Sequence, residues 1–281
     1  MGEVTEATTS AQAAKARRFL ELHRPGNPLL MPNAWDVGSA RLLASLGFEA
    51  LATTSSGHAA TLGLLDGAVG RDAALDHCAQ LVAATELAVS ADLENGFGHK
   101  PSEVATTVKL AGETGLAGCS IEDFTGDRAD PIYAMEFAAA RIAAAARVAH
   151  EGPVHLVLTA RAENHIRGRD DLADTIARLR AYEKAGADVL FAPGLVDAEQ
   201  IQAVIRAVKR PVSVLALPAT PPVAELGRLG VSRISVGGAL ALAALGTLVE
   251  AATELRDHGT YGYLERAGVG ARAARSAFGR G

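Results

Sequence analysis

Two carboxylates that lie two positions apart mark the stretch of the sequence where chemistry is expected. Asp92 and Glu94 stand in the segment SADLENGFG (residues 90–98), directly after an apolar run with the character of a strand. A strand places alternate side chains on one face, so the two carboxylates would project together. Such a pair repels itself unless a cation or a proton separates the charges, which makes it a candidate site for a hard metal ion. A strand end whose acids simply face solvent is the alternative interpretation.

Polar residues also follow the other apolar runs of the chain. Asn33 ends the first run, with Trp35 shortly after it, and the segment Thr53–Gly57 follows the second run. Glu122 ends the fourth run and Arg161 the fifth, whereas the last three runs end without charged residues. Charges scattered by chance would not collect at the same end of consecutive strands. The pattern therefore favours a functional site over acids that simply meet solvent.

Alternating strands and helices must position these residues. A helical pattern that ends at a glycine and is followed by an apolar run occurs at Gly47, Gly115, Gly186 and Gly230. Glycine tolerates the left-handed conformation that ends many helices. Most of the runs are almost continuously apolar, which is typical of parallel strands buried on both faces. The eight predicted strands are residues 28–33, 49–55, 87–93, 117–122, 154–160, 188–193, 212–217 and 232–236.

Eight strand–helix units in a chain of 281 residues predict an α/β fold, a (β/α)8 TIM barrel, with a doubly wound open sheet as the alternative. We expect a single domain over residues 1–281, with a leading helix at Ala11–His23 and a helical tail from Gly259 that packs on a neighbour. In this fold, chemistry occurs at the carboxyl ends of the strands. The polar residues described above would meet there.

The composition excludes several classes of protein. Hydrophobic residues make up 49% of the chain, enough for a large core, whereas aromatic residues make up 4% and the net charge is −5. This balance argues against binding to nucleic acid. The two cysteines, Cys78 and Cys119, lack metal-ligand spacing, and no apolar run has the length of a membrane span. The sequence predicts a cytoplasmic protein with reduced thiols and with neither a membrane nor a nucleic acid as partner.

The residue types at the predicted rim suit an enzyme that acts on a 2-oxo acid. Asp92, Glu94 and Glu122 offer the oxygen ligands that Mg²⁺ prefers, with Mn²⁺ as a second possibility. A 2-oxo acid chelates such an ion, and the backbone N–H groups of residues 54–57 would hold its carboxylate. Arg161 presents a planar fork to a second oxyanion or to a developing enolate. Metal and arginine together would stabilise the enolate that remains when a bond at C3 breaks.

Six motifs occur in the order and at the distances found in a known family. They are PNAWD (32–36), TTSSGHAATLGLLDG (53–67), ADLENGFG (91–98), SIEDF (120–124), TARAEN (159–164) and GADVLFAPG (186–194). On these motifs residues 15–255 resemble the isocitrate lyase/phosphoenolpyruvate mutase superfamily, in particular its carboxyvinyl-carboxyphosphonate phosphorylmutase-like branch. The resemblance implies a (β/α)8 barrel whose last helix is exchanged between subunits of a dimer or tetramer. It also implies Mg²⁺ and a small 2-oxo or 2-hydroxy carboxylate substrate that reacts through an enolpyruvate-like anion.

The resemblance also implies roles for individual residues. Ser55 to Gly57 stand where the family binds the substrate carboxylate, and Asp66 matches the aspartate that is the nucleophile in the mutase. Asp92 and Glu122 match metal-side carboxylates, and Arg161 matches the arginine on the reacting oxygens. The predicted catalytic residues are Asp66, Glu122 and Arg161; the predicted metal ligands are Asp92, Glu94 and Glu122; the predicted substrate-binding residues are Asn33, Trp35, Thr54, Ser55, Ser56, Gly57 and Arg161.

Departures from the family pattern narrow the reaction. The family often has an aspartate at the position of Ser90, and Glu94 would replace its charge. The segment FTGDRADPIY (124–133) lacks the cysteine, lysine and histidine of the lyase loop and the lysine and asparagine of the mutase loop. We therefore expect metal-assisted cleavage of a C–C bond in a small 2-oxo dicarboxylate such as oxaloacetate, by decarboxylation or hydrolysis. Two alternatives are a P–C bond enzyme acting on phosphonopyruvate through Asp66, and a barrel that binds a 2-oxo acid without turning it over.

Overall fold

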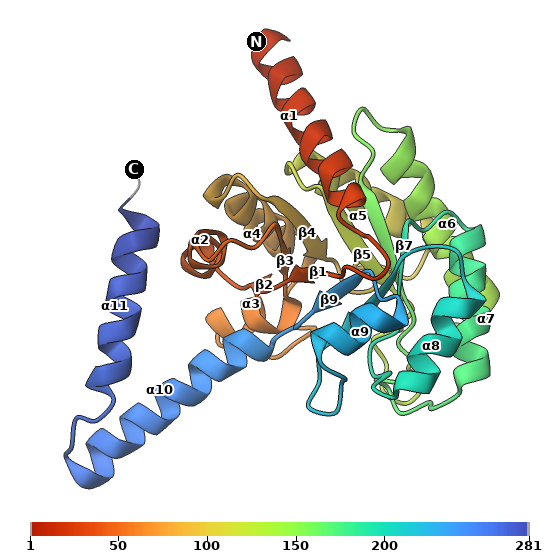
Figure 1. The fold of residues 1–281 in the computed structure, drawn as a ribbon. Coiled ribbons are helices and arrows are strands. Elements are labelled where there is room, and N and C mark those ends of the chain that lie inside the picture. Colours follow the sequence, from red (N-terminus) through yellow and green to blue (C-terminus); the bar gives the residue numbers. More distant parts are fainter. Residues whose placement is uncertain (1, 280–281) are drawn as a thin grey trace.

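A closed ring of parallel strands forms the centre of the molecule (Figure 1). The computed structural model describes residues 2–279, with side chains from residue 9 onward, so residues 1, 280 and 281 of the predicted domain lie outside the described residues. The strands neighbour one another in the order β1-β9-β8-β7-β6-β5-β4-β3-β2, and all the pairs are parallel. They are β1 (Leu29–Met31), β2 (Asn33–Ala34), β3 (Ala50–Thr53), β4 (Ala88–Asp92), β5 (Gly118–Glu122), β6 (Val157–Arg161), β7 (Val189–Phe191), β8 (Val212–Leu215) and β9 (Arg233–Ser235).

The ring closes through the first predicted strand, which is split in two. β1 pairs with β9 and β2 pairs with β3, and only Pro32 separates the two halves. Proline has no backbone N–H to give to a strand ladder, which accounts for the interruption. The carbonyl oxygen of Pro32 still accepts from the N–H of Ala52 at 3.0 Å. The predicted α/β barrel of TIM type is therefore confirmed, and the open-sheet alternative is wrong.

All eight predicted strands occur, and their ends are shorter or shifted. The largest shift is in β6, which begins at Val157 rather than at residue 154. The interior of the protein is formed where strand residues meet the inner faces of the helices, and residues such as Leu51, Ile121, Leu158 and Leu190 are at most 1% exposed there. Nearly continuous apolar runs thus become strands that are buried on both faces.

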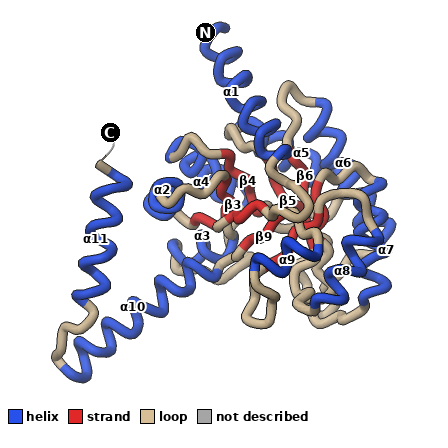
Figure 2. The backbone as a smooth tube through the Cα atoms, in the orientation of Figure 1, coloured by secondary structure: helices blue, strands red, loops and turns tan. Residues whose placement is uncertain are grey.

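Helices follow the strands and cover the outside of the ring (Figure 2). Asp36 starts the first of them, because its side chain accepts from Ser39 N while the Ser39 hydroxyl accepts from Asp36 N. The four glycines predicted to end helices have φ values from 88° at Gly47 to 106° at Gly186. The outer helices are α2 (Val37–Ser45), α3 (Ser55–Thr61), α4 (Arg71–Ala84), α5 (Pro101–Glu113), α6 (Met135–Glu151), α7 (Leu172–Lys184), α8 (Ala198–Ala207) and α9 (Val223–Leu229).

The leading helix closes one end of the barrel. It is α1 (Gly2–Glu21), which starts earlier than the predicted Ala11 and ends before the predicted His23. His23 lies two residues beyond the end of this helix, is 5% exposed and contacts the ring of Phe19 edge-on, with the ring centres 4.8 Å apart. The amino ends of the strands are therefore covered by the chain that precedes β1.

The last two helices form an arm that leaves the barrel (Figure 1). α10 (Ala239–His258) projects outward, and α11 (Leu264–Phe278) packs against α2 of the same chain. Several large apolar side chains on α10 are exposed, among them Leu242, Leu245 and Leu248. The predicted exchange of the last helix between subunits remains a prediction. Within residues 2–279, none of the helices combines the length and apolar character that a membrane span requires.

Gly118 offers a test of how tightly the barrel wall is packed. A Cβ at this position would lie 2.5 Å from the carbonyl oxygen of Val157 and 3.1 Å from the ring of Phe19. Gly118→Ala should therefore lower the free energy of unfolding by about 1–3 kcal/mol, as overpacking of a core does. The measurement is denaturant unfolding. Gly246→Ala is the control, since nothing lies within 4 Å of its Cβ position in α10; an equal loss of stability in both variants would contradict the prediction.

Candidate active site

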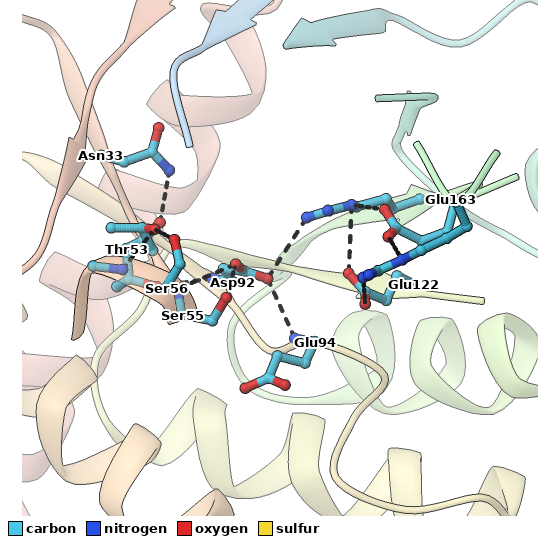
Figure 3. A network of polar contacts seen from close by, with 12 residues as sticks. Asn33, Thr53, Ser55, Ser56, Asp92, Glu94, Glu122 and Glu163 are labelled. Atoms are coloured by element: carbon cyan, nitrogen blue, oxygen red, sulfur yellow. Dashed lines mark hydrogen bonds and ion pairs between the residues drawn. The ribbon is translucent and has the colours of Figure 1, made fainter. Parts of the chain in front are cut away.

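The carboxyl ends of three neighbouring strands bring charged residues together at one rim. Asp92, Glu122 and Arg161 are the last residues of β4, β5 and β6, and Glu122 and Arg161 are paired in the ladder. They line a cavity of about 890 Å³, a size suited to a small organic ligand. Figure 3 shows the polar network of this rim. The structure thus brings together residues that stand far apart in the sequence.

Arg161 is surrounded by carboxylates. Its Nε forms an ion pair with Glu163 and lies 3.4 Å from Glu122 Oε2, and its Nη1 lies 4.0 Å from Asp92 Oδ1. Burial alone would lower the pKa of Arg161, but the neighbouring charges, led by Glu163 and Glu122, outweigh burial and raise it above its ordinary value. Arg161 is therefore held as a permanent cation in a fixed orientation.

Arg167 is the second cation of the network. Its Nε donates to Glu163 Oε2 at 2.8 Å, its Nη2 lies 3.8 Å from Glu122 Oε1, and its guanidinium lies over the ring of Phe124 at 3.7 Å. Burial and the charge of Glu163 nevertheless raise the pKa of Glu122 well above its ordinary value. The two arginines therefore do not neutralise the carboxylates completely.

The charge balance of this network tests whether a divalent cation fits. Four carboxylates, those of Asp92, Glu94, Glu122 and Glu163, interact with only two guanidiniums, those of Arg161 and Arg167. With all four carboxylates ionised, the network has two excess negative charges, and burial together with the neighbouring carboxylates raises the pKa of Glu94 and of Glu122. All its free ligand atoms are hard oxygens. This donor set fits Mg²⁺ or Mn²⁺, which keep several waters and need few protein ligands.

Glu94 has a different conformation from the one its spacing predicts. β4 ends at Asp92 and Glu94 has a φ of 50°, so strand alternation stops before Glu94. Its backbone N–H donates to Asp92 Oδ1 at 3.3 Å, while its carboxylate turns away from Glu122 (Figure 3). Burial and the charges of Asp92 and Asp66 raise the pKa of Glu94 to about 7. The predicted shared strand face is therefore wrong, although Glu94 does line the cavity.

The Ser/Thr loop begins α3, and two of its backbone N–H groups already have partners. Ser55 donates to Asp92 Oδ2 from its backbone N–H at 3.3 Å and from its hydroxyl at 3.0 Å. The N–H of Gly57 donates to Thr54 Oγ1 at 3.3 Å, and the hydroxyls of Thr54 and Ser56 lie 3.1 Å apart. The loop therefore positions Asp92 and presents fewer free donors than the sequence suggests.

Two predicted substrate contacts have structural roles. Asn33 donates to the carbonyl oxygen of Thr53 at 2.7 Å and accepts from Val236 N at 3.1 Å, so it links strands on either side of the barrel seam while it lines the cavity. Trp35 packs behind Gly57, where an added Cβ would lie 2.9 Å from the Trp35 Cβ. Neither Trp35 nor Gly57 is among the described residues that line the cavity.

The mouth of the cavity is formed by loops. Asp66 lies there on the exposed segment between α3 and α4. The segment 124–133, which lacks the family's loop base, contributes Phe124, Gly126 and Arg128 to the lining. Its ends are joined by a bridge between Phe124 and Ile132. The segment that departs from the family pattern therefore forms part of the cavity wall.

Two histidines stack behind the Ser/Thr loop. The rings of His58 and His77 are parallel within 9° with their centres 3.8 Å apart, and both line a small pocket behind the rim. Burial lowers the pKa of both residues, to about 4 for His77, where the charge of His58 adds to the effect. His58 is therefore a packing residue in this structure.

A second group of possible metal ligands lies at the opposite end of the barrel. His150 Nε2 and His155 Nε2 lie 2.9 Å and 3.3 Å from Asp188 Oδ2, and the two rings stack with their centres 4.1 Å apart. The ligand atoms of these three residues all lie within 4.8 Å of one another, which no three donors of the rim achieve within the described residues. Imidazole nitrogens suit zinc-like ions better than Mg²⁺, so this group is separate from the predicted magnesium site.

Sequence reasoning missed four arginines that line the cavity, Arg71, Arg128, Arg167 and Arg233, and for the last two the sequence contains a signal. Arg167 lies four positions after Glu163, a spacing that pairs charges on a helical turn and could have indicated the contact. Arg233 interrupts the apolar strand 232–236, and a charge inside a buried strand is the signal that could have identified it. Both line the cavity.

Comparisons with known proteins agree with the geometry. A profile of the phosphoenolpyruvate phosphomutase family matches residues 19–256. The chain is 55% identical to a Burkholderia cenocepacia protein described only broadly as a lyase or mutase; that crystal structure superimposes with a TM-score of 0.88 and covers 91% of this chain and 92% of the other.

Two further relatives have named activities. An oxaloacetate decarboxylase from Paraburkholderia xenovorans is 30% identical over 210 residues, which is 72% of this chain and 69% of the relative. The structure of an oxaloacetate acetylhydrolase with its product oxalate has a TM-score of 0.80 at 27% identity, over 90% of this chain and 89% of the other.

His77 should make the stability of the protein sensitive to acid. Its pKa is about 4 in the folded chain but about 6.5 when unfolded. Below pH 6.5 the unfolded chain binds the proton first, so stability should fall as the pH drops toward 4. His77→Phe keeps the stacked ring without a titrating group and should remove about 1–3 kcal/mol of this loss.

Denaturant unfolding between pH 7 and pH 4 measures the effect of this substitution. His258→Phe, on the exposed surface of α10, is the matched control and should keep the wild-type slope. A parallel pH dependence of wild type and His77→Phe would show that His77 does not couple folding to protonation.

Proposed function

The chain belongs to the isocitrate lyase/phosphoenolpyruvate mutase superfamily, and from this premise we propose that it cleaves a C–C bond next to the carbonyl of a small 2-oxo dicarboxylate such as oxaloacetate. The observation that carries this proposal is the partly buried cation of Arg161, fixed by Glu122 and Glu163 at the edge of the cavity. A fixed guanidinium stabilises negative charge that develops on a nearby oxygen. The two relatives that act on oxaloacetate support the same substrate class.

We assign the metal-side positions to Asp92 and Glu122, with Glu94 contributing charge from the far side of Asp92. The excess negative charge of the network supports this assignment. Mg²⁺ bound there would polarise the keto oxygen of the substrate and stabilise its enolate. The hydroxyl and N–H of Ser55 hold the Asp92 carboxylate in place for that role.

The chain's own residues account for the remaining requirements of the reaction. In decarboxylation, the electrons of the C3–C4 bond move into the C2–C3 bond and charge passes to the keto oxygen as carbon dioxide leaves. The resulting enolate of pyruvate then takes a proton at C3 from solvent at the cavity mouth. Arg161 would hold the enolate oxygen or the C1 carboxylate, and the hydroxyl of Ser56 would hold the remaining oxygens. Phe124 and Phe191 line the cavity and would limit the access of water to the enolate.

Two other activities fit the same site. Asp66 lines the cavity mouth, so a P–C bond enzyme acting on phosphonopyruvate is the second candidate. The segment 124–133 lacks the loop residues that the family's lyases and mutase use. The third candidate is therefore a protein that binds a 2-oxo acid without turning it over. We also propose a cytoplasmic location and, through the exposed apolar face of α10, a homodimer or homotetramer.

Asp92→Ala should lower the rate of pyruvate formation from oxaloacetate by at least about 100-fold, since it removes both a metal-side oxygen and the partner of Ser55. The assay compares oxaloacetate, phosphonopyruvate and methylisocitrate at the same Mg²⁺ concentration. Asp76→Ala, an exposed carboxylate of α4, is the matched control for the reaction that free metal promotes.

The products distinguish the candidates. Pyruvate from oxaloacetate above the Asp92→Ala background supports decarboxylation, and oxalate with acetate supports hydrolysis. Phosphoenolpyruvate or phosphate from phosphonopyruvate would favour the Asp66 mechanism. Wild-type rates equal to the Asp92→Ala background for every substrate would contradict the proposed function.

The proposed assembly has its own test. Leu242 and Leu248 are exposed on α10, and a second copy of the chain would bury them. Leu242→Glu combined with Leu248→Glu should reduce the molar mass measured by light scattering to that of one chain, because buried charges oppose association. Thr247→Glu, also exposed on α10, is the control; a monomeric wild type would contradict the proposal.

A further inference from the structure

A guanidinium lies inside the barrel, one layer below the charged rim. Arg233 belongs to β9 and is only 3% exposed, yet it lines the same cavity as Asp92 and Glu122. Strand alternation places Arg233 two residues below Ser235, just as Thr159 lies two residues below Arg161. Two strand residues correspond to roughly 7 Å. Arg233 therefore lies at the floor of the cavity.

The partners of Arg233 are all neutral. Its Nε donates to Ser213 Oγ at 2.9 Å and its Nη1 donates to Thr159 Oγ1 at 3.0 Å. From below, His23 Nε2 lies 3.3 Å from Nη1, and His23 Nδ1 lies 2.8 Å from the carbonyl oxygen of Phe19. A carbonyl oxygen only accepts, so Nδ1 carries the proton of His23 and Nε2 accepts from Arg233. Burial and the charge of Arg233 lower the pKa of His23 to about 3, which keeps this imidazole neutral.

The charge of Arg233 has no counter-ion. None of the ion pairs among the described residues includes Arg233, and its third nitrogen, Nη2, has no hydrogen-bond partner among them. Burial lowers the pKa of Arg233 to about 9, so the group stays charged at neutral pH. An isolated buried charge is strongly unfavourable. The fork is nevertheless fixed in place, with one nitrogen free.

The surroundings of Arg233 are unusual for a barrel interior. Inward-facing layers of such barrels are mostly branched apolar residues, whereas this layer contains the hydroxyls of Ser90 and Ser120 on the cavity wall. Thr159 and Ser213, which fix the guanidinium, add two more hydroxyls. Hydroxyl donors around a fixed guanidinium form a surface suited to a carboxylate.

Several other candidate anion receptors of the cavity are paired within the protein or exposed to solvent. The N–H groups of Ser55 and Gly57 donate within the protein. Arg71 pairs with Asp72 at 3.0 Å, and Arg128 is exposed to solvent at the mouth. Arg233 is thus the buried cation that a ligand could neutralise with the greatest effect.

We infer that Arg233 binds the second carboxylate of the substrate, so that the site selects dicarboxylates over monocarboxylates. The inference rests on the proposed function, because it places a 2-oxo acid group at the rim beside Arg161. The distance of roughly 7 Å between the two layers matches the reach of a four-carbon dicarboxylate. Ser90 and Ser120 contribute further hydroxyl donors on the cavity wall in the layer of Arg233.

Isothermal titration calorimetry with Mg²⁺ present tests the inference on two probes that share a 2-oxo acid group. 3,3-Difluorooxaloacetate carries the second carboxylate, and pyruvate lacks it. The wild type should bind the dicarboxylate at least about tenfold more tightly than pyruvate. Arg233→Met should weaken dicarboxylate binding by about 10- to 100-fold, the effect of one charged hydrogen-bonded pair, and change pyruvate binding by less than about twofold.

Two further variants separate recognition from folding. Arg233→Lys keeps the charge without the planar fork and should restore part of the dicarboxylate preference. Arg141→Met is the matched control: Arg141 is similarly buried at 1% exposure but does not line the cavity, and it donates to the backbone carbonyls of Asn95, Gly98 and His99. It should lower the melting temperature and leave the ratio of the two affinities unchanged.

The outcomes separate this inference from the proposed reaction. The inference is overturned if the wild type binds both probes equally tightly. It is also overturned if Arg233→Met weakens the binding of both probes by the same factor. If Arg233→Met loses only dicarboxylate binding and the wild type does not convert oxaloacetate, the inference is supported and the proposed reaction is contradicted. If the wild type turns over oxaloacetate and Arg233→Met keeps the wild-type preference for the dicarboxylate, the proposed reaction is supported and the inference about Arg233 is overturned.

Discussion

The repulsion between carboxylates at the carboxyl ends of β4, β5 and β6 is the constraint on which the rim depends. A parallel barrel brings these strand ends together whether or not their charges are compatible. Arg161 makes the arrangement possible, because its guanidinium lies among Asp92, Glu122 and Glu163. The arginines do not cancel the whole negative charge, so the folded chain retains a local field that favours a cation. The same field would repel an anionic substrate in the absence of that cation.

The fold could be predicted from the sequence because its main determinants are local. Nearly continuous apolar runs and the helix-ending glycines Gly47, Gly115, Gly186 and Gly230 were sufficient to place eight strands, and all four glycines have positive φ. The split at Pro32 follows from the missing N–H of proline and could have been anticipated. The ends of the strands could not be anticipated, because they depend on which residues of the neighbouring strands complete the hydrogen bonds.

The candidate site was predicted in its residue types and less well in its geometry. Asp92, Glu122 and Arg161 meet because the strand register places them there, and register follows from the fold. Glu94 escapes the prediction because its left-handed backbone redirects the side chain. The bond from the Ser55 N–H to Asp92 joins residues that are distant in the sequence, whereas the bond from the Gly57 N–H to Thr54 is a local N-cap that the sequence could have indicated. Arg233 was visible as a charge in an apolar strand, but its free nitrogen and its lack of a counter-ion appear only in three dimensions.

The leading helix has a consequence for the electrical properties of the cavity. α1 and His23 seal the amino end of the barrel directly beneath Arg233. Water is therefore kept from the lower side of the guanidinium, and its field is screened only from above. A chain that began at the first strand would admit solvent from below and raise the local dielectric constant, so that the interior charge would act over a shorter distance. The end of α1 and His23 thus shield from solvent a group more than two hundred positions away.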